Sequence, residues 1–376
     1  MRINFGEIRL GSVSKANLLV AIERNWITQG KLVDTFEKQW NNKFGYADSV
    51  AMSSGTDADI NACLCLYDFG AERGDNIICP ALTFIATANA ILFAGFIPNF
   101  VDINRETLNI DETKIESAIN KHTRAIMVTH VMGKPCEMDA IMDISRRHNL
   151  FVIEDSCEAH SMKYKEKYTG LIGDISTFSF YAAHILVSGE GGMCSTKHSN
   201  IGDILRSTRN HGRPPGTKYF NFIRTGLNSR MTDLSAAIAL GELDQIDNII
   251  AIRRSNKKKL DDYLSDLYSV FYTHHEEDYE YISPHAFPLI FKEDNENRYN
   301  NLYTFLTDSG IECKTLFSSV PTQHRAFNFM GYKLGDFPEA EFIGRNGLHF
   351  GLHQYLSEND LVYISDTIHR WVKKYC

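Results

Sequence analysis

The chain lacks the features that mark several large classes of protein. No apolar stretch reaches the ~18 residues that a membrane span requires, and the first residues have no continuous apolar block of the kind that directs secretion. The net charge is −8, and the basic residues are scattered except in short runs such as Arg253–Arg254 and Lys257–Lys259. This distribution argues against a nucleic-acid-binding face. We therefore expect a cytoplasmic protein that binds neither membranes nor nucleic acids.

Cysteine pairs of the CxxC type are also missing. The eight cysteines are dispersed, and several lie in apolar runs where buried free thiols are common. Only Cys63 and Cys65 are close in sequence, and no nearby pair completes a zinc or iron–sulfur pattern. We expect neither disulfides nor a bound metal.

The composition predicts an ordinary globular core. The chain has 376 residues, of which 43% are hydrophobic and 23% are charged. Its first two-thirds alternates short apolar runs with helical patterns, which is typical of a mostly parallel α/β sheet. The expected strands are 50–53, 77–79, 98–101, 125–129, 150–153, 177–180 and 192–195, and the expected helices between them are 57–69, 84–93, 115–119 and 139–148.

A long helical pattern begins near Thr232 and continues towards Leu264, with apolar residues at three- and four-residue steps. After about Tyr268 the pattern reads strand, helix, strand and closing helix, over 286–291, 298–307, 348–352 and 358–372. We therefore predict a large domain over 1–247, with an N-terminal helical segment, and a small α+β domain over 248–376.

In two segments, residues that could bind a ligand follow the end of a predicted strand. In SSGTDADINACLCL (53–66), Ser54, Gly55 and Thr56 lie where a strand gives way to a helix, a natural cradle for a phosphate. The alternative is a plain glycine turn with an N-cap residue. In NLFVIEDSCEAH (149–160), Asp155 and Glu158 follow a buried strand and so face the crevice where open α/β sheets bind ligands. The alternative for Asp155 is a helix cap.

One missing residue type is informative. No lysine lies between Lys167 and Lys197, and the run STFSFYAAHILVSGEGGMCS (176–195) carries His184. Lysines 163, 165 and 167 fall in KYKEKYTG, which predicts an exposed hairpin tip. An imidazole exchanges protons near neutral pH but cannot form a Schiff base with an aldehyde. Alone, His184 would also suit a structural role.

These motifs, in this order and spacing, resemble the DegT/DnrJ/EryC1/StrS family of sugar aminotransferases. The resemblance runs from WITQGKLVDTFE at Trp26 to HQYLSENDL and includes FSF, GEGG and TGLNSRMTD. It implies the fold-type-I pyridoxal-phosphate architecture, with active sites at a homodimer interface. His184 stands where the family usually has lysine, which is typical of its 3-dehydratase branch. That branch has the run AHHIT, whereas this chain has AHIL, with one histidine.

The resemblance also implies roles for individual residues. Phe84 would stack on the pyridine ring, Asp155 would hold the pyridine nitrogen, and Glu158 would face the ring hydroxyl or imine side. Ser179 would bind the cofactor phosphate, and Asn228 would reach the phosphate in the partner subunit. We expect substrate contacts, on weaker grounds, from polar loop residues: His211, Arg213, Arg230 and His324.

The implied reaction uses pyridoxal 5′-phosphate and pyridoxamine 5′-phosphate, with L-glutamate as amino donor. His184 would move protons while the C3 hydroxyl leaves a nucleotide-linked 4-keto-6-deoxy sugar, giving a 3,6-dideoxy-4-keto sugar and ammonia. Two alternatives stay open: an aminotransferase in which histidine, native or engineered, replaces the lysine, and a catalytically inactive sugar-binding homologue. The nucleotide is also open, as is the choice of hexose or heptose.

Overall fold

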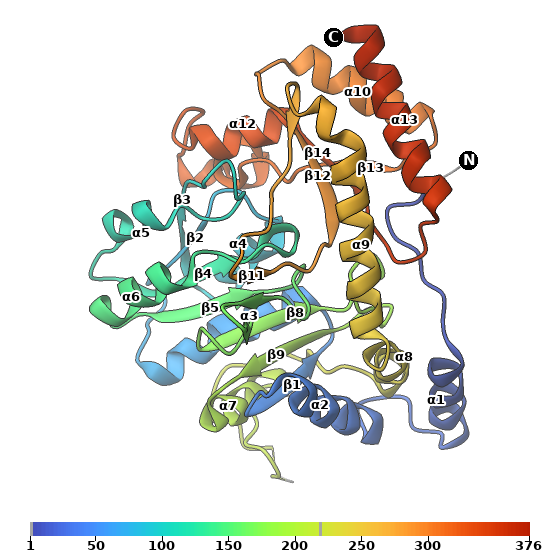
Figure 1. The fold of residues 1–376 in the computed structure, drawn as a ribbon. Coiled ribbons are helices and arrows are strands. Elements are labelled where there is room, and N and C mark those ends of the chain that lie inside the picture. Colours follow the sequence, from blue (N-terminus) through green and yellow to red (C-terminus); the bar gives the residue numbers. More distant parts are fainter. Residues whose placement is uncertain (1–2, 218–219) are drawn as a thin grey trace.

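The protein is built around a seven-stranded sheet, seen at the centre of Figure 1. The computed structural model describes residues 3–217 and 220–376. The strand order is β1-β9-β8-β5-β4-β2-β3, and the pairings make all strands parallel except β9, which is antiparallel to both neighbours. The bounds are β1 Asp48–Met52, β2 Asn76–Pro80, β3 Ile97–Val101, β4 Thr123–Thr129, β5 Phe151–Asp155, β8 Ile175–Ser179 and β9 Gly192–Thr196.

Both faces of this sheet are covered by helices, because successive strand residues point to opposite sides. Ile77 and Met127 pack in the core beneath α3, α4 and α7, whereas Ile78 and Val128 pack under α5 and α6. Helices α2 and α8 cover the β1, β8 and β9 end of that second face. The bounds are α1 Ser12–Glu23, α2 Lys31–Phe44, α3 Gly55–Cys65, α4 Ile85–Phe93, α5 Glu112–Ala118, α6 Met138–His148, α7 Ser199–Arg209 and α8 Asp233–Leu243.

A second, four-stranded sheet belongs to the C-terminal part, in the order β10-β12-β14-β13. Helices α9, α10 and α13 bury its apolar residues in a separate core. In Figure 1, α9 runs from beside α8 up to this second layer. The bounds are α9 Ile246–Leu264, β10 Phe271–Tyr272, β12 Ala286–Phe291, α10 Glu296–Asp308, β13 Cys313–Thr315, α11 Val320–Gln323, α12 Pro338–Asn346, β14 Gly347–Gly351 and α13 Glu358–Tyr375.

Small strands link the two parts of the chain. The predicted hairpin exists as β6 (Lys163–Tyr164) and β7 (Lys167–Tyr168), and β6 also pairs with β11 (Glu280–Tyr281). Nearby, the buried ammonium of Lys134 binds Glu280 at 2.6 Å. These contacts connect the loop after β4 to the segment that leads into β12.

The predicted fold class, a large α/β domain with a mostly parallel mixed sheet plus a smaller α+β part, is confirmed. The long helical pattern differs in detail, since it forms two helices that are interrupted at Asp244–Gln245. The break is invisible to a periodicity argument because apolar residues continue on both sides. The boundary at 247/248 stays a prediction. Among the described residues, no helix is both long and apolar enough to cross a bilayer.

Candidate active site

The predicted site residues gather at one edge of the large sheet. Gly55 follows β1, Phe84 follows β2, Asp155 ends β5 and Ser179 ends β8, while His184 lies in the turn after β8. These strands are parallel, so their carboxyl ends share one edge, where α/β sheets bind ligands.

The start of α3 forms a tight cradle with the ends of β8 and β9. Ser54 caps the helix by accepting a hydrogen bond from the Asp57 N–H at 3.0 Å. A Cβ on Gly55 would lie 2.6 Å from the Cβ of Ser179, and one on Gly192 would lie 2.2 Å from the Ser54 carbonyl oxygen. Only glycines allow these approaches. The N–H groups at this helix start and the Ser179 hydroxyl thus suit a phosphate.

Asp155 lies at the end of a chain of hydroxyl groups. The Thr87 hydroxyl donates to Asp155 Oδ2 at 2.7 Å, and Thr83 bonds both Thr87 and Thr129. The backbone N–H of Cys157 donates to Oδ1 at 3.2 Å. These contacts fix a buried carboxylate that could hold a protonated ring nitrogen.

Asp59, which sequence reasoning missed, lies behind Asp155 on α3. Burial, reinforced by the charge of Asp155, raises the pKa of Asp59 well above its usual value, and Thr177 donates to it at 2.6 Å. Carboxylate and thiol atoms of Asp59, Asp155 and Cys157 lie within 4.8 Å of one another. Burial also raises the pKa of the Cys157 thiol. Burial therefore favours the protonated, neutral forms of Asp59 and Cys157.

Glu158 is a largely buried acid that accepts one backbone hydrogen bond. Its Oε2 accepts a hydrogen bond from the backbone N–H of Met132 at 2.9 Å. Burial raises the pKa of Glu158 to about 8, and the negative charge of Asp155 acts in the same direction. The hydrogen bond from Met132 and the positive charge of Lys314 lower the pKa, but by less. The side chain is therefore mostly a neutral acid at pH 7.

His184 presents a neutral imidazole to the site. Burial lowers its pKa to about 3, and the positive charges of Arg253 and Lys314 act in the same direction. Its Nδ1 is buried without a hydrogen-bond partner among the described residues. Nε2 is not one of the buried, unpaired atoms. Nε2 is thus the nitrogen through which His184 can meet a ligand.

Three further residues around His184 come from the C-terminal part and were missed by sequence reasoning. His285 lies just before β12, its ring centroid 4.9 Å from that of His184. Lys314 on β13 and His349 on β14 are direct cross-strand partners, so their side chains share one face. The Lys314 ammonium lies 4.0 Å from the centroid of the buried Phe5 ring.

Phe84 and Asn228 are open to solvent in the single chain. The Phe84 side chain is 60% exposed, so it is not part of the hydrophobic core. Asn228 is exposed as well, and its side chain accepts a hydrogen bond from Arg230 at 2.9 Å. Both positions are compatible with the predicted contacts to cofactor and partner subunit.

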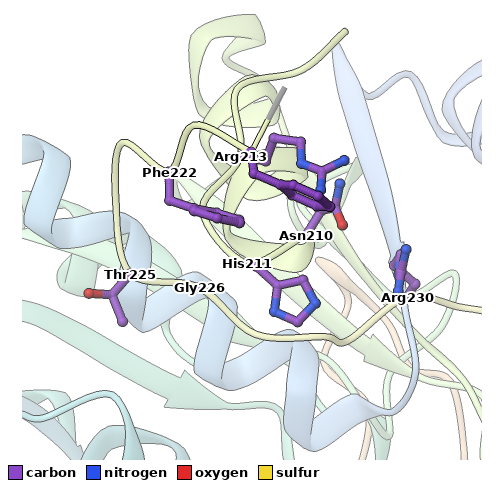
Figure 2. A pocket seen from close by; sticks show the side chains of 8 residues that line it. Asn210, His211, Arg213, Phe222, Thr225, Gly226 and Arg230 are labelled. Carbon is purple, nitrogen blue, oxygen red and sulfur yellow. The ribbon is translucent and has the colours of Figure 1, made fainter. Parts of the chain in front are cut away.

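The four residues that we expected, on weaker grounds, to contact the substrate lie in two different places. His211, Arg213 and Arg230 surround one pocket of about 590 Å³, which Figure 2 shows together with Phe222. The Arg213 guanidinium lies 4.9 Å from the Phe220 ring centroid. His324 lies elsewhere, in the C-terminal part, and its Nε2–H donates to the Phe317 carbonyl at 3.1 Å.

Fold and site together define a fold-type-I α/β protein with a glycine-lined helix start, a hydrogen-bonded carboxylate and a partly buried imidazole at one sheet edge. Residues 10–369 match the DegT/DnrJ/EryC1/StrS aminotransferase family. The chain belongs to this family, as its motifs predict.

The similar proteins include a GDP-perosamine synthase and GDP-4-keto-6-deoxy-D-mannose 3-dehydratases. The chain is 34% identical to a GDP-perosamine synthase of Escherichia coli O157:H7, covering 93% of each chain. It is 30% identical to a GDP-4-keto-6-deoxy-D-mannose 3-dehydratase of Yersinia pseudotuberculosis, covering 89% of each. The E. coli GDP-4-keto-6-deoxy-D-mannose-3-dehydratase with bound hydrated PLP superposes with a TM-score of 0.89 at 25% identity, covering 98% of this chain and 99% of that one.

The cradle can be tested by adding one methyl group. In Gly55→Ala the new Cβ would collide with Ser179, so the helix start must shift. We expect affinity for pyridoxal phosphate, measured by absorbance titration, to fall at least ~10-fold, about 1.4 kcal/mol. Gly11→Ala is the matched control, because nothing lies within 4 Å of a Cβ there. Equal affinity of the two variants would contradict the assignment.

Buried imidazoles should make the protein sensitive to acid. Burial lowers the pKa of His349 to about 3, so below its unfolded value of ~6.5 only the unfolded chain is protonated there. The stabilisation is complete above pH ~6.5 and is lost as pH falls towards 3, by about 2 kcal/mol at pH 5 for one such group. In His349→Phe, urea unfolding at pH 7.5 and 5 should show a smaller loss than in the native chain. An unchanged loss would show that His349 does not titrate in this way.

Proposed function

We propose that this protein removes the C3 hydroxyl group from a nucleotide-linked 4-keto-6-deoxy sugar. The products are a 3,6-dideoxy-4-keto sugar and ammonia, and glutamate is the amino donor. That the chain belongs to the pyridoxal-phosphate-dependent sugar aminotransferase family is established. The observation that carries the finer proposal is His184, a partly buried imidazole at the sheet edge in a segment without lysine.

Pyridoxal 5′-phosphate, with its pyridoxamine form, is the cofactor, as the sequence predicts. Residues at the sheet edge support a binding mode for each of its parts. The cradle of Gly55 and Ser179 would bind the phosphate, Asp155 would hold the ring nitrogen, and the exposed Phe84 would cover the ring. The bound cofactor would supply an electron sink that lets the C3 hydroxyl depart.

His184 would handle the protons of this reaction at Nε2. At pH 7 the imidazole is neutral, because its pKa is lowered to about 3, so it begins as a base. Once protonated, the partly buried ring is an acid that readily gives the proton to a departing hydroxyl group, because the charges of Arg253 and Lys314 disfavour the imidazolium. Such acid–base catalysis is typically worth ~10²–10⁴ in rate. A lysine amine would instead attach to the cofactor aldehyde.

Amino transfer is the second candidate function, and two observations favour it. The chain is somewhat more similar to the GDP-perosamine synthase of E. coli O157:H7 than to the Yersinia 3-dehydratase, at 34% against 30%. Lys314 also places an ammonium where its charge lowers the pKa of both His184 and His349. If this amine attached to the cofactor, the chain could keep aminotransferase chemistry.

We also propose that the protein is a homodimer whose two subunits share their active sites, and that it acts in the cytoplasm. Exposed apolar side chains on and after α1 offer a contact surface: Val13, Leu19, Ile22, Trp26 and Ile27. The exposed Asn228 would then reach the partner's cofactor. The names of both relatives above refer to GDP-linked sugars, so a GDP-linked sugar is the first substrate to test.

The reaction products distinguish the candidates. Incubation with pyridoxal phosphate, glutamate and nucleotide-linked 4-keto-6-deoxy sugars, GDP-linked first, should release ammonia and a 3-deoxy sugar, identified by mass spectrometry and NMR. A stable amino sugar, with Lys314 labelled by cofactor after borohydride reduction, would establish amino transfer instead. No product from any sugar in the panel would favour a sugar-binding homologue.

The role of His184 can be tested by returning the amine. In His184→Lys we expect covalent, borohydride-reducible attachment of pyridoxal phosphate, because a primary amine captures the aldehyde. Dehydration, measured as ammonia release, should fall at least ~100-fold. His184→Asn is the control, since it should lose dehydration without gaining covalent attachment. Dehydration at the native rate in both variants would exclude His184 as the base.

A further inference from the structure

One cation beside the site has no anionic partner. Lys314 on β13 is exposed, and its ammonium forms neither a hydrogen bond nor an ion pair with any residue that the structure describes. Its charge nevertheless reaches the site, because it lowers the pKa of His184, of His285 and of His349. An unpaired ammonium next to a ligand-binding edge is suited to a ligand that brings the negative charge itself.

The ring of Phe5 holds this ammonium in place. The Lys314 Nζ lies 4.0 Å from the centroid of the Phe5 ring, which is only 5% exposed. The same ring lies 5.2 Å from the His349 ring and 5.9 Å from the His285 ring, measured between centroids. A cation over an aromatic face is attracted by the negative face of the ring. Phe5 therefore keeps the Lys314 ammonium next to the two imidazoles.

The N-terminal segment that carries Phe5 is fixed at both ends of this contact. The Phe5 N–H donates to Glu312 Oε2 at 2.9 Å, just before β13. A Cβ on Gly6 would lie 3.0 Å from the Cα of Ala183, so the segment packs closely against the turn that carries His184. The place of the Phe5 ring is thus set by the fold.

The nearby acids do not pair with Lys314. Glu312, two residues earlier, binds the backbone of Phe5 and forms no ion pair with the ammonium among the described residues. The pKa of Glu158 is raised to about 8, so this acid is mostly neutral at pH 7. Arg253, the other cation, donates to backbone carbonyl groups. The side of the site formed by the C-terminal part therefore carries positive charge that no described carboxylate pairs with.

We propose that Lys314 is a substrate-binding residue that binds an anionic oxygen group of the substrate, and that Phe5 is the positioning residue beneath it. The identity of the ligands rests on the proposed function. Glutamate offers carboxylates, and the nucleotide-linked sugar offers a diphosphate. The cofactor phosphate already has a candidate place at Gly55 and Ser179. An ammonium donates charge-assisted hydrogen bonds to either kind of group.

This role of Lys314 differs from attachment to the cofactor, which the second candidate function would require. A Schiff base needs a primary amine, whereas anion binding needs only a positive charge with N–H donors. Arginine keeps the second property and lacks the first. The replacement Lys314→Arg therefore separates the two roles.

The proposal can be tested by calorimetric titration of the full-length protein loaded with pyridoxal phosphate. The two probes are glutarate, a dicarboxylate without an amino group, and GDP. In Lys314→Met we expect at least ~10-fold weaker binding of one probe, because a charged hydrogen bond is lost, and that probe identifies the anionic group. Lys314→Arg should stay within ~3-fold of the native affinity. Phe5→Leu should weaken the same probe about 3-fold, since it removes the aromatic face.

Controls separate anion binding from general effects. Lys373→Met removes an exposed lysine at the end of α13 and should leave both affinities unchanged. Lys314→Gln replaces Lys314→Met if the latter does not fold, as judged by circular dichroism. Native affinity for both probes in the folded neutral variant, an equal loss in Lys314→Arg or Lys373→Met, or no binding of either probe to the native protein would overturn the proposal. The titration needs no turnover, so its result is independent of whether dehydration is the reaction.

Discussion

The arrangement of the site depends on the buried guanidinium of Arg253. This one side chain binds the carbonyl oxygens of His184, Pro284 and His285, and so ties the turn after β8 to the strand that enters the C-terminal sheet. Burial lowers the pKa of Arg253 to about 10, which still leaves it charged at neutral pH. Hydrogen bonds from a charged donor are among the stronger ones, and loss of this donor would leave three buried carbonyls without it. Helix α9 therefore positions His184 and His285, through Arg253, as well as connecting the two sheets.

The same burial gives the site its electrostatic character. The pKa of the acids Asp59 and Glu158 is raised, while that of His184, His285 and His349 is lowered. Each of these groups is pushed towards its neutral form, because a low-dielectric interior disfavours isolated charge. Neutral acids and bases in contact can exchange protons without large solvent reorganisation. A site of this kind is suited to chemistry in which one proton is taken from carbon and another is given to oxygen.

Sequence reasoning found the residues that follow strand ends, and the physical reason is topological. Gly55, Asp155 and Ser179 come at the carboxyl ends of parallel strands, so a reading of strands alone already brings them to one edge. Asp59, by contrast, lies inside an apolar helix and looks like a core position. His285 and His349 stand within or beside apolar strand segments, where a histidine is ordinarily a packed residue. Their approach to His184 depends on how the second sheet docks, and local patterns carry no information on that docking. The break between α8 and α9 was missed for a related reason, since apolar spacing continues across it.

A histidine at position 184, where the family resemblance implies a lysine, would have a consequence for the rest of the site. A lysine would carry its own charge into the cavity beside Arg253 and Lys314, and it would consume the aldehyde form of the cofactor. An imidazole can enter as a neutral group, and it has two nitrogens, so one can face the substrate while the other faces the protein. In His184 the Nδ1 atom is buried without a hydrogen-bond partner among the described residues, and Nε2 is not one of these buried, unpaired atoms. Lysine has a single nitrogen and no equivalent of the second ring nitrogen. The imidazole of His285 lies next to that of His184, with ring centroids 4.9 Å apart, so the two positions should be considered together when this chain is compared with its relatives.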